Sequence, residues 1–415
     1  MDALVLVGGY ATRLQPLTLR TPKSLVPVAG KPALTHLFEQ LKAAGVKEVL
    51  VSLNNAQRKV EEYFGDGQRI GISILYHYEG HQKEEQRLGA IGSIHEAIEK
   101  FGPPKMGLVL ASDNYAQGLD FAQLARVREK HKAAAAIAFY ELADKALVVN
   151  YGVAALGSDG RVVKFQEKPK VEEAVSKLAS TAFYSLSSEF LTEHIPAYVA
   201  HKRKAGEKPD RLGDLFNHYV DKLPIYGMPF TGMWGDANTP ETYVEMNKLA
   251  MNYLTNVQAG KGKTQENGQQ VSIHPDAKVA AGAIIRGPAI LEQGAVVETG
   301  ALIGPYTHLL HHARAGAHSR VVGSIVFEHA DIGNGAHVEN SILEGYSHVG
   351  EHARIEGYSM LGYKTKVGAH GRLLGRSRVW SFVEVGEEAV VEGTIKAPLT
   401  AHEEQLVSSK YWHCV

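Results

Sequence analysis

The sequence predicts an α/β fold with a doubly wound, mostly parallel sheet, followed by a domain built as a parallel β-helix. Three observations lead to this prediction. A short apolar run at residues 3–7 ends in two glycines, apolar runs then alternate with helical patterns up to about residue 257, and a six-residue period begins at Ile273. Because strands that alternate with helices form parallel sheets, we expect right-handed crossovers in the first part.

The composition is that of a folded globular protein with a sizeable core. Hydrophobic residues make up 44% of the 415 residues, and 44 basic residues balance 45 acidic ones. This near-zero net charge favours neither nucleic acid nor a membrane surface as a partner. No apolar run approaches membrane-spanning length, and the chain starts with a strand pattern rather than a signal peptide. The single cysteine, Cys414, excludes a disulfide within the chain, so a cytoplasmic location is expected.

The first strand and the loop after it predict a phosphate-binding site. Residues 3–7 (ALVLV) are too few for a helix and rich in Val and Leu, which is typical of a strand buried on both faces. Gly8-Gly9 indicates a sharp turn or the close approach of a bulky group. Loop amides, together with Arg13 and Lys23, suit a polyphosphate at the carboxyl end of a parallel strand. The loop matches neither G-x-G-x-x-G nor the P-loop pattern.

The residues after this loop continue the alternation. We expect, in order, a helix at 33–44, a strand at 46–53, a helix at 58–63, a strand at 71–76, a helix ending near 99, strands at 106–110 and 134–140, a hairpin turning at Asp159-Gly160, and a helix from 239 to about 254. Thr239 and Pro240 are expected to be the N-cap and the first residue of the last helix. Asp214 is most simply another N-cap.

An aspartate follows the strand expected at 106–110. Asp113 would therefore lie on the edge of the sheet where open α/β folds place their ligands. A hard cation such as Mg²⁺ takes carboxylate and phosphate oxygens as ligands. The structural alternative is an aspartate that starts a turn.

An aliphatic residue recurs every six positions beyond residue 270. The positions are Ile273, Val279, Ile285, Leu291, Val297 and Ile303, and the pattern returns at Val326, Ile332, Val338 and again at Val349, Ile355, Leu361 and Val367. This repeat is typical of a parallel β-helix, in which each coil stacks its apolar residues on the next. The phase slip between Val338 and Val349 predicts an inserted loop or a corner change. We therefore predict a first domain over 1–257, a linker over 258–270, a β-helix over 271–400 and a tail over 401–415, part of which could dock on a neighbour.

The beginning of the chain closely resembles the sugar-1-phosphate nucleotidyltransferases. Their pattern is roughly G-G-x-G-T-R-L-x-P-L-T, then P-K-x-L-x-P-V, then K-P, and residues 8–18, 22–28 and 31–32 follow it. Ala11 stands where the family usually has glycine, so we expect a backbone there that residues other than glycine can adopt. The segment 88–92 (LGAIG) is similar to the family's L-G-T-A-G, which packs against the nucleotide base.

Three further segments carry the resemblance. Asp113 matches the metal-binding aspartate, Glu167-Lys168-Pro169 matches E-K-P, and residues 234–240 are similar to W-x-D-I-G-T-P, with Asp236 as a second metal carboxylate. At the sugar site, residues 180–184 (STAFY) lack the asparagine and glycine of the usual N-A-G.

The resemblance implies a role for each matching residue. Gly8, Gly9, Leu88, Gly89 and Gly92 would bind the nucleotide, Arg13 would hold the pyrophosphate, Lys23 would stabilise the transferring phosphoryl group, Lys168 would contact the sugar phosphate, Glu167 would hold the sugar, and Asp113 and Asp236 would hold Mg²⁺.

The implied reaction joins an NTP and a sugar 1-phosphate into a nucleotide sugar and pyrophosphate. The opening residues and the β-helical second domain look most like the mannose-1-phosphate guanylyltransferase branch, with glucose-1-phosphate thymidylyl- and uridylyltransferases close behind. The second domain looks like the left-handed β-helix of hexapeptide-repeat proteins, through which a homo-oligomer is expected. Two alternatives stay open: a second, acyl-transferring site among the many β-helix histidines, and a regulatory subunit that binds a nucleotide sugar without turning it over.

Overall fold

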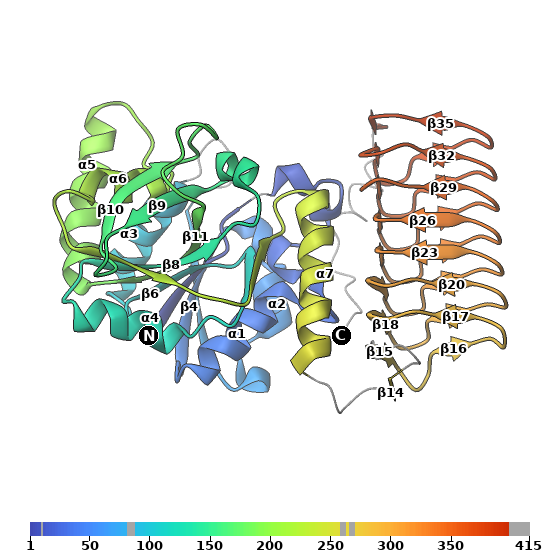
Figure 1. Ribbon diagram of the computed structural model, residues 1–415, viewed down its shortest axis with the longest axis horizontal. Helices are drawn as coiled ribbons and strands as arrows, with labels where there is room; N and C mark the ends of the chain where they lie inside the picture. The colour runs from blue at the N-terminus through green and yellow to red at the C-terminus, as the bar shows by residue number, and fades with distance from the viewer. Residues whose placement is uncertain (10, 81–87, 258–262, 265–269, 398–415) are drawn as a thin grey trace. The chain divides into compact units, whose positions relative to one another are not determined.

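The structure is a computed structural model (Figure 1) that describes residues 1–9, 11–80, 88–257, 263–264 and 270–397. Its contacts divide the chain into two compact units. Unit 1 comprises Met1–Tyr10 and Ala33–Trp234, and unit 2 comprises Ala11–Pro32 and Gly235–Val415. The loop that carries Arg13 and Lys23 is thus grouped with the β-helix rather than with the strand that precedes it. The domain boundaries predicted from the sequence stay a prediction, and the tail over 401–415 lies outside the described residues.

Unit 1 is built on a mixed sheet in which β6, β1, β4 and β5 are parallel neighbours. Leu4 of β1 aligns with Leu50 of β4 and Val109 of β6, and all three side chains are fully buried. Antiparallel strands extend the sheet from β6 through β11 to the predicted hairpin β9–β10 and to β8, which pairs with β12. The strands are β1 (Ala3–Leu6), β4 (Glu48–Leu53), β5 (Ser73–Tyr78), β6 (Leu108–Ala111), β8 (Ala135–Glu141), β9 (Gly152–Leu156), β10 (Val162–Glu167), β11 (Leu178–Leu186) and β12 (Ile225–Pro229), and β7 (Asn114–Gln117) and β13 (Met233–Asp236) lie outside this sheet.

Helices cover both faces of this sheet, as a doubly wound fold requires. On one face α3, α5 and α6 share a core with Leu4, Leu50 and Tyr184. The residue before Tyr184 in β11, Phe183, points to the opposite face, where its ring meets Phe121 of α4 at 5.4 Å between centroids. The helices are α1 (Ala33–Ala43), α2 (Lys59–Phe64), α3 (Gly89–Phe101), α4 (Phe121–Lys130), α5 (Ile195–Lys204), which the π-turn η8 (Phe190–His194) precedes, and α6 (Leu212–Tyr219).

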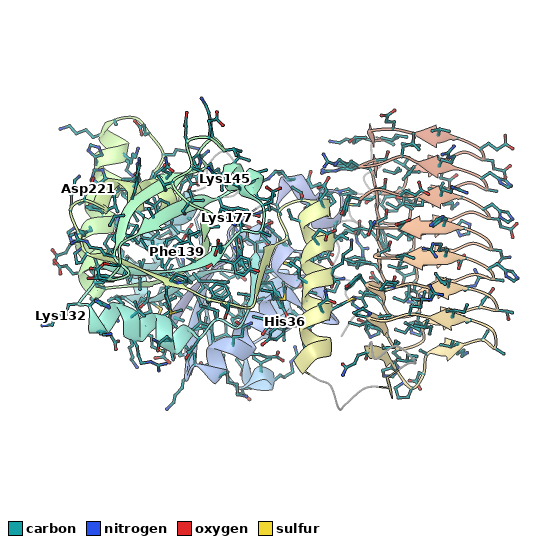
Figure 2. All side chains as sticks on the ribbon, in the orientation of Figure 1. His36, Lys132, Phe139, Lys145, Lys177 and Asp221 are labelled. Carbon is teal, nitrogen blue, oxygen red and sulfur yellow. The ribbon has the colours of Figure 1, made fainter. Side chains whose placement is uncertain are left out.

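Apolar side chains lie in the interior of unit 1 and charged side chains lie on its surface (Figure 2). Phe139 of β8 is fully buried, whereas Lys132 and Asp221 are exposed. Two local predictions need correction. Asp214 lies in the first turn of α6, whose N-cap is Arg211, and α3 ends at Phe101 rather than near residue 99.

Unit 2 contains a left-handed parallel β-helix, with short strands stacked in three parallel sheets (Figure 1). The first sheet has β15 (Gln270–Ile273), β18 (Ala289–Leu291), β21 (Thr307–Leu309), β24 (Ile325–Val326), β27 (Ile342–Leu343), β30 (Met360–Leu361), β33 (Arg378–Val379) and β36 (Thr394–Ile395), with β14 (Lys263–Thr264) antiparallel to β15. The second has β16 (Lys278–Val279), β19 (Val296–Val297), β22 (Arg314–Ala315), β25 (Asp331–Ile332), β28 (His348–Val349), β31 (Lys366–Val367) and β34 (Glu384–Val385). The third has β17 (Ile284–Ile285), β20 (Leu302–Ile303), β23 (Arg320–Val322), β26 (His337–Glu339), β29 (Arg354–Ile355), β32 (Arg372–Leu373) and β35 (Val390–Val391).

The aliphatic repeat fills the interior of the β-helix. Ile303, Ile332 and Ile355 are fully buried in one continuous core, whereas Val279, in the first strand of its sheet, is exposed. The predicted phase slip is a corner change: Val338 and Leu343, which are inner residues of successive strands β26 and β27, are five positions apart in the sequence instead of six. The chain therefore loses one corner residue there, and no loop is inserted.

Unit 2 also holds helix α7 (Pro240–Val257) and the loop 11–32. Thr239 Oγ1 accepts a hydrogen bond from Thr242 N at 3.3 Å, and Thr239 N donates in return to Thr242 Oγ1 at 3.0 Å, which confirms Thr239 as the N-cap. The loop folds into short 3-10 turns, η1 (Thr12–Leu14), η2 (Leu17–Leu19) and η3 (Lys23–Leu25), before the small hairpin of β2 (Pro27–Val28) and β3 (Lys31–Pro32). No helix among the described residues is long and apolar enough to cross a membrane.

Candidate active site

The glycine loop is held in place from the neighbouring strand β4 and the turn after it. Asn54 donates a hydrogen bond to the Gly8 carbonyl at 2.8 Å, and Gln57 donates to the Gly9 carbonyl at 2.9 Å. A Cβ at Gly8 would lie 2.7 Å from the Glu79 carboxylate, so a larger residue would have to displace that side chain; this is a close approach of the kind that the sequence predicted. Sequence reasoning did not single out Asn54, although a polar residue directly after a buried strand was a usable signal.

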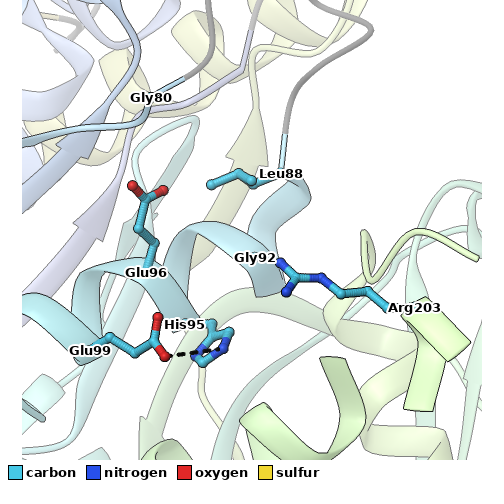
Figure 3. A pocket seen from close by; sticks show the side chains of 7 residues that line it. All are labelled: Gly80, Leu88, Gly92, His95, Glu96, Glu99 and Arg203. Atoms are coloured by element: carbon cyan, nitrogen blue, oxygen red, sulfur yellow. Dashed lines mark ion pairs between the residues drawn. The ribbon is translucent and has the colours of Figure 1, made fainter. Parts of the chain in front are cut away.

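The segment that resembles the base-binding motif forms the beginning of α3. Gly89 has a φ of 75°, and Ala90 N donates to the Asp210 carbonyl at 3.1 Å. Leu88 and Gly92 line a cavity of about 550 Å³ together with Glu96, His95, Glu99, Arg203 and Gly80 (Figure 3). The structure thus places a hollow beside Leu88 and Gly92, and its side chains carry both signs of charge.

Asp113 lies in the turn between β6 and β7, after the carboxyl end of a strand that is parallel to β1. Asn114 Nδ2 donates to Asp113 Oδ1 at 2.7 Å, and Trp234 Nε1 donates to Asn114 Oδ1 at 3.0 Å. This chain of hydrogen bonds fixes the orientation of the carboxylate.

Glu167, at the end of β10, occupies room that two glycines provide. A Cβ at Gly213 would overlap Glu167 Oε2, and one at Gly152 would lie 2.9 Å from the same oxygen. Burial raises the pKa of the Glu167 carboxyl; Lys168 counters this, and Asp214 adds to it. Lys168 itself is exposed and has a φ of 48°, with its N–H bonded to the Tyr151 carbonyl at 3.0 Å.

Glu167 and Asp113 both act on the buried Tyr184 hydroxyl. Its pKa is raised mainly by burial and further by these two carboxylates. Ala182, two residues earlier on β11, has a φ of 60° at a break in the strand register with β8. This is where the family motif has glycine, so the alanine adopts a left-handed conformation that glycine would reach at lower cost.

In unit 2, Lys23 and Asp236 are joined through Asn238. Lys23 Nζ donates to Asn238 Oδ1 at 2.6 Å, and Asn238 N donates to Asp236 Oδ1 at 2.9 Å. Lys23 and Asp236 are both largely buried, with 9% and 3% of their surfaces exposed. Asn238 was not predicted, although it stands at the glycine position of W-x-D-I-G-T-P and thus departs from the pattern that the neighbouring residues follow.

Arg13 is exposed on the turn η1. Ala11, just before this turn, has a φ of 49° and a ψ of 40°, which lie in the left-handed region. A residue other than glycine can adopt this conformation, as expected, but at a cost of about 1–2 kcal/mol. Thr18 Oγ1 closes the loop by donating to the Ala11 carbonyl at 2.8 Å.

The carboxylates suit a hard divalent cation in their chemistry. Asp113 and Asp236 are each oriented through Oδ1 by a neighbouring asparagine. The described residues contain no cluster of three or more His, Cys, Asp and Glu side chains arranged to hold a metal. Carboxylate and phosphate oxygens are the ligands that Mg²⁺ takes, and the prediction that these two aspartates hold one ion stays a prediction.

The predicted site residues are therefore divided between the units. Unit 1 contains the residues that are predicted to bind the nucleotide, together with Asp113, Glu167 and Lys168, and unit 2 contains Arg13, Lys23 and Asp236. Hydrogen bonds link Lys23 to Asp236 through Asn238, and the Asp113 and Glu167 carboxylates both add to the raised pKa of the buried Tyr184 hydroxyl; the joint action of the two groups stays a prediction.

Comparison with known proteins decides the family. The family model described as nucleotidyl transferase matches residues 2–252. The chain belongs to this family. A second model, described as GMPPB C-terminal domain, matches residues 285–396. A putative glucose-1-phosphate thymidylyltransferase from Bacillus anthracis covers 60% of this chain and 95% of its own, with a TM-score of 0.51 and 22% identity, which supports the fold.

Curated relatives match most of this nucleotidyl transferase. Mannose-1-phosphate guanylyltransferase of Mycobacterium tuberculosis is 30% identical over 74% of this chain and 78% of its own. Probable mannose-1-phosphate guanylyltransferase 3 of Oryza sativa is 29% identical over 88% and 96%, and UTP–glucose-1-phosphate uridylyltransferase of Synechocystis is 29% identical over 83% and 87%. The chain is thus a sugar-1-phosphate nucleotidyltransferase, which confirms the resemblance seen in the sequence.

Proposed function

We propose that this nucleotidyl transferase joins GTP and mannose 1-phosphate into GDP-mannose and pyrophosphate. The observation that carries the proposal is similarity along almost the whole chain to a probable mannose-1-phosphate guanylyltransferase, together with the match of the β-helix to the GMPPB C-terminal domain. Similarity that spans both the transferase part and the β-helix is a stronger argument for the substrate pair than similarity of the transferase part alone.

In the proposed reaction a sugar-phosphate oxygen attacks the α-phosphorus in line. The bond from that oxygen to the α-phosphorus forms, the bond from the α-phosphorus to the β-phosphate oxygen breaks, and pyrophosphate leaves. The protein has little covalent work to do and acts by positioning anions and stabilising the charge that develops.

Each charged side chain has one assigned task in this proposal. Lys23 stabilises the transferring phosphoryl group, and its position is set by the hydrogen bond to Asn238. Arg13 holds the leaving pyrophosphate, which suits an exposed guanidinium on a turn next to the glycine loop. Lys168 steers the incoming sugar phosphate, and Glu167 accepts hydrogen bonds from sugar hydroxyl groups.

Asp113 and Asp236 are proposed as ligands of Mg²⁺, which when bound would supply a Lewis acid and a template for the phosphate oxygens. Gly8 and Gly9 lie where the triphosphate would bind. Leu88, Gly89 and Gly92 would form the wall against which the base packs, next to the cavity of Figure 3.

The second candidate is UTP and glucose 1-phosphate, because the Synechocystis uridylyltransferase is similar over 83% of the chain. A regulatory subunit without turnover is less favoured, since Arg13, Lys23, Asp113, Lys168 and Asp236 are all present and such a subunit has no need of them.

We also infer a homo-oligomer that forms through the β-helix. Val279 and Ile284, in the first strands of their sheets, are 39% and 48% exposed, and such apolar strands favour cover by another chain. Light scattering coupled to size exclusion tests this inference, and a monomer at micromolar concentration would contradict it. The cytoplasmic location stays a prediction.

The decisive experiment measures pyrophosphate release by the purified protein with Mg²⁺ over a grid of common NTPs and sugar 1-phosphates. We expect one dominant pair, GTP with mannose 1-phosphate. Dominance of UTP with glucose 1-phosphate would select the second candidate. A blank grid, with a nucleotide sugar still raising the melting temperature, would instead identify a regulatory subunit.

A further inference from the structure

The loop that carries Lys23 is anchored on the β-helix by one buried arginine. Arg20 is 9% exposed, and its guanidinium carbon lies 3.4 Å from the centroid of the Tyr363 ring. Its Nη1 is 3.9 Å from Oε1 of Glu344, which is 2% exposed. A planar, weakly hydrated cation stacked on a ring and next to a buried carboxylate is an arrangement that arginine supports and lysine does not reproduce.

The surface of the β-helix next to Arg20 carries two carboxylates that favour a cation. Glu344 follows β27 and Glu328 follows β24, the preceding strand of the same sheet. Burial raises the pKa of the Glu328 carboxyl, and Arg20 is among the groups that counter this rise. The Glu328 carboxylate lies against Gly345, where a Cβ would be 2.5 Å from Oε1. The buried Glu344 carboxylate and the half-buried Glu328 carboxylate lie on adjacent coils and repel each other, so a cation between the loop and the β-helix stabilises the arrangement.

A short and stiff stretch of backbone connects Arg20 to Lys23. Arg20 N and Thr21 N both donate to the Leu17 carbonyl, at 3.2 and 3.1 Å, which ties them to the turn η2. Only Thr21 and Pro22 separate Arg20 from Lys23, and both are buried. Because proline fixes its own φ and restricts the residue before it, this link is stiff. A shift of Arg20 is therefore passed on to the backbone of Lys23.

We propose that the β-helix positions the catalytic loop through Arg20, and that Arg20 is a positioning residue for Lys23. The ammonium of Lys23 is then fixed from two sides, by Asn238 at its tip and by the Arg20 anchor at its backbone. This inference rests on the proposed role of Lys23 at the transferring phosphoryl group. It assigns to the β-helix a part in the reaction itself.

The test compares variants that separate anchoring from stability. Arg20→Met together with Glu344→Gln removes the cation and the most buried carboxylate next to it, so the number of charges of each sign lost is equal. We expect kcat to fall about 10- to 100-fold with KM for both substrates changed less than threefold, because Lys23 acts mainly in the transition state. Arg20→Lys should recover only part of the rate.

Tyrosine variants supply matched controls. Tyr363→Phe keeps the ring face and should keep kcat, whereas Tyr363→Leu should lower it. Tyr358 lies on the same β-helix but donates to Glu245 of α7 at 2.7 Å, so Tyr358→Leu should leave kcat unchanged. Wild-type kcat and KM in the Arg20→Met/Glu344→Gln variant, with wild-type turnover in Tyr363→Leu, would overturn the inference.

A second measurement keeps this inference separate from the proposed function. Hydrogen–deuterium exchange of peptides from residues 11–26 needs no turnover. We expect the Arg20→Met/Glu344→Gln variant to exchange faster in these peptides and at the wild-type rate in α7. Unchanged exchange would overturn the inference even if the enzyme is active, and faster exchange in a protein that is inactive with every substrate pair would contradict only the proposed function.

Discussion

The α/β unit and the β-helix differ in what fills the space next to crowded backbone positions. In the α/β unit, the carboxylates of Glu79 and Glu167 occupy the space that a side chain at Gly8 or Gly213 would take, so a larger residue at either position would displace the carboxylate. In the β-helix the corners have positive φ and are filled by large residues such as His312, His329 and Tyr346, whose rings stack at 5.0 and 4.7 Å. Repetition lets each strained corner gain contacts from the next coil, whereas a unique site must leave room for one functional group.

The largest loss of activity is expected when one of the charges assigned to catalysis is removed, in either unit. Asp113→Ala or Lys23→Ala should lower kcat by about 10³-fold or more, because each removes a group assigned to the developing charge. Pyrophosphate release measures the loss, and circular dichroism should show an intact fold. Full activity in both variants would refute the assigned site.

A glycine in each region gives the next largest contrast. Gly213→Ala should displace Glu167 and raise KM for the sugar phosphate about 100-fold, because the added methyl group overlaps the carboxylate. Gly282→Ala on the β-helix meets nothing within 4 Å and has a φ of 80°, so it should cost only about 1 kcal/mol of stability and no activity. If both variants changed KM for the sugar phosphate equally, the space next to Gly213 would have no special role in binding.

Stability of the β-helix should depend on its inner residues. Ile355→Ala removes a fully buried side chain and should lower the free energy of unfolding by about 2–5 kcal/mol. Arg354→Ala changes the outward neighbour in the same strand, which is 58% exposed, and should have an effect below about 0.5 kcal/mol. Thermal unfolding measures both effects. Similar decreases of the melting temperature in the two variants would show that the stacked inner residues contribute no more to stability than the outer ones.

The pH dependence of KM for the sugar phosphate should test the role of Glu167. Since burial raises the pKa of its carboxyl, the ionised form that accepts sugar hydroxyls is lost at a less acidic pH than for an ordinary glutamate. KM for the sugar phosphate should rise several-fold as pH falls through this pKa, and Glu167→Gln should remove that dependence. The native pKa exceeds the unfolded one, so ionisation costs stability and Glu167→Gln should be slightly more stable at pH 7. A profile that is unchanged in the variant would assign the titration to another group.

The smallest effects are expected at Ala11 and Ala182, two of the alanines with positive φ. Ala11→Gly and Ala182→Gly relieve strain in the folded state but add freedom to the unfolded chain, so stability should change by less than about 1 kcal/mol. Denaturant unfolding measures the change. A loss above about 2 kcal/mol would mean that the methyl groups themselves pack in the core.

The sequence by itself determined the two architectures. Strand and helix periods predicted β1, β4, β5, α1 and α7, and the aliphatic repeat predicted the stacked coils, because these features depend on residues near one another in the chain. The motifs likewise singled out Lys23, Asp113, Glu167 and Asp236, because each of these residues stands within a short run of matching neighbours. The hexapeptide phase even located a shortened corner after Val338, although it could not say whether residues were lost or gained.

Only the tertiary structure decided which residues meet. Lys23 reaches Asn238 across 215 positions, Glu79 comes up against Gly8, and Arg20 lies on Tyr363 of the β-helix. No local pattern encodes these contacts, because a single hydrogen bond or stacked ring leaves no period in the sequence. They follow from how packed elements bring distant side chains together, and they set the exact place of the charges that the motifs could only name.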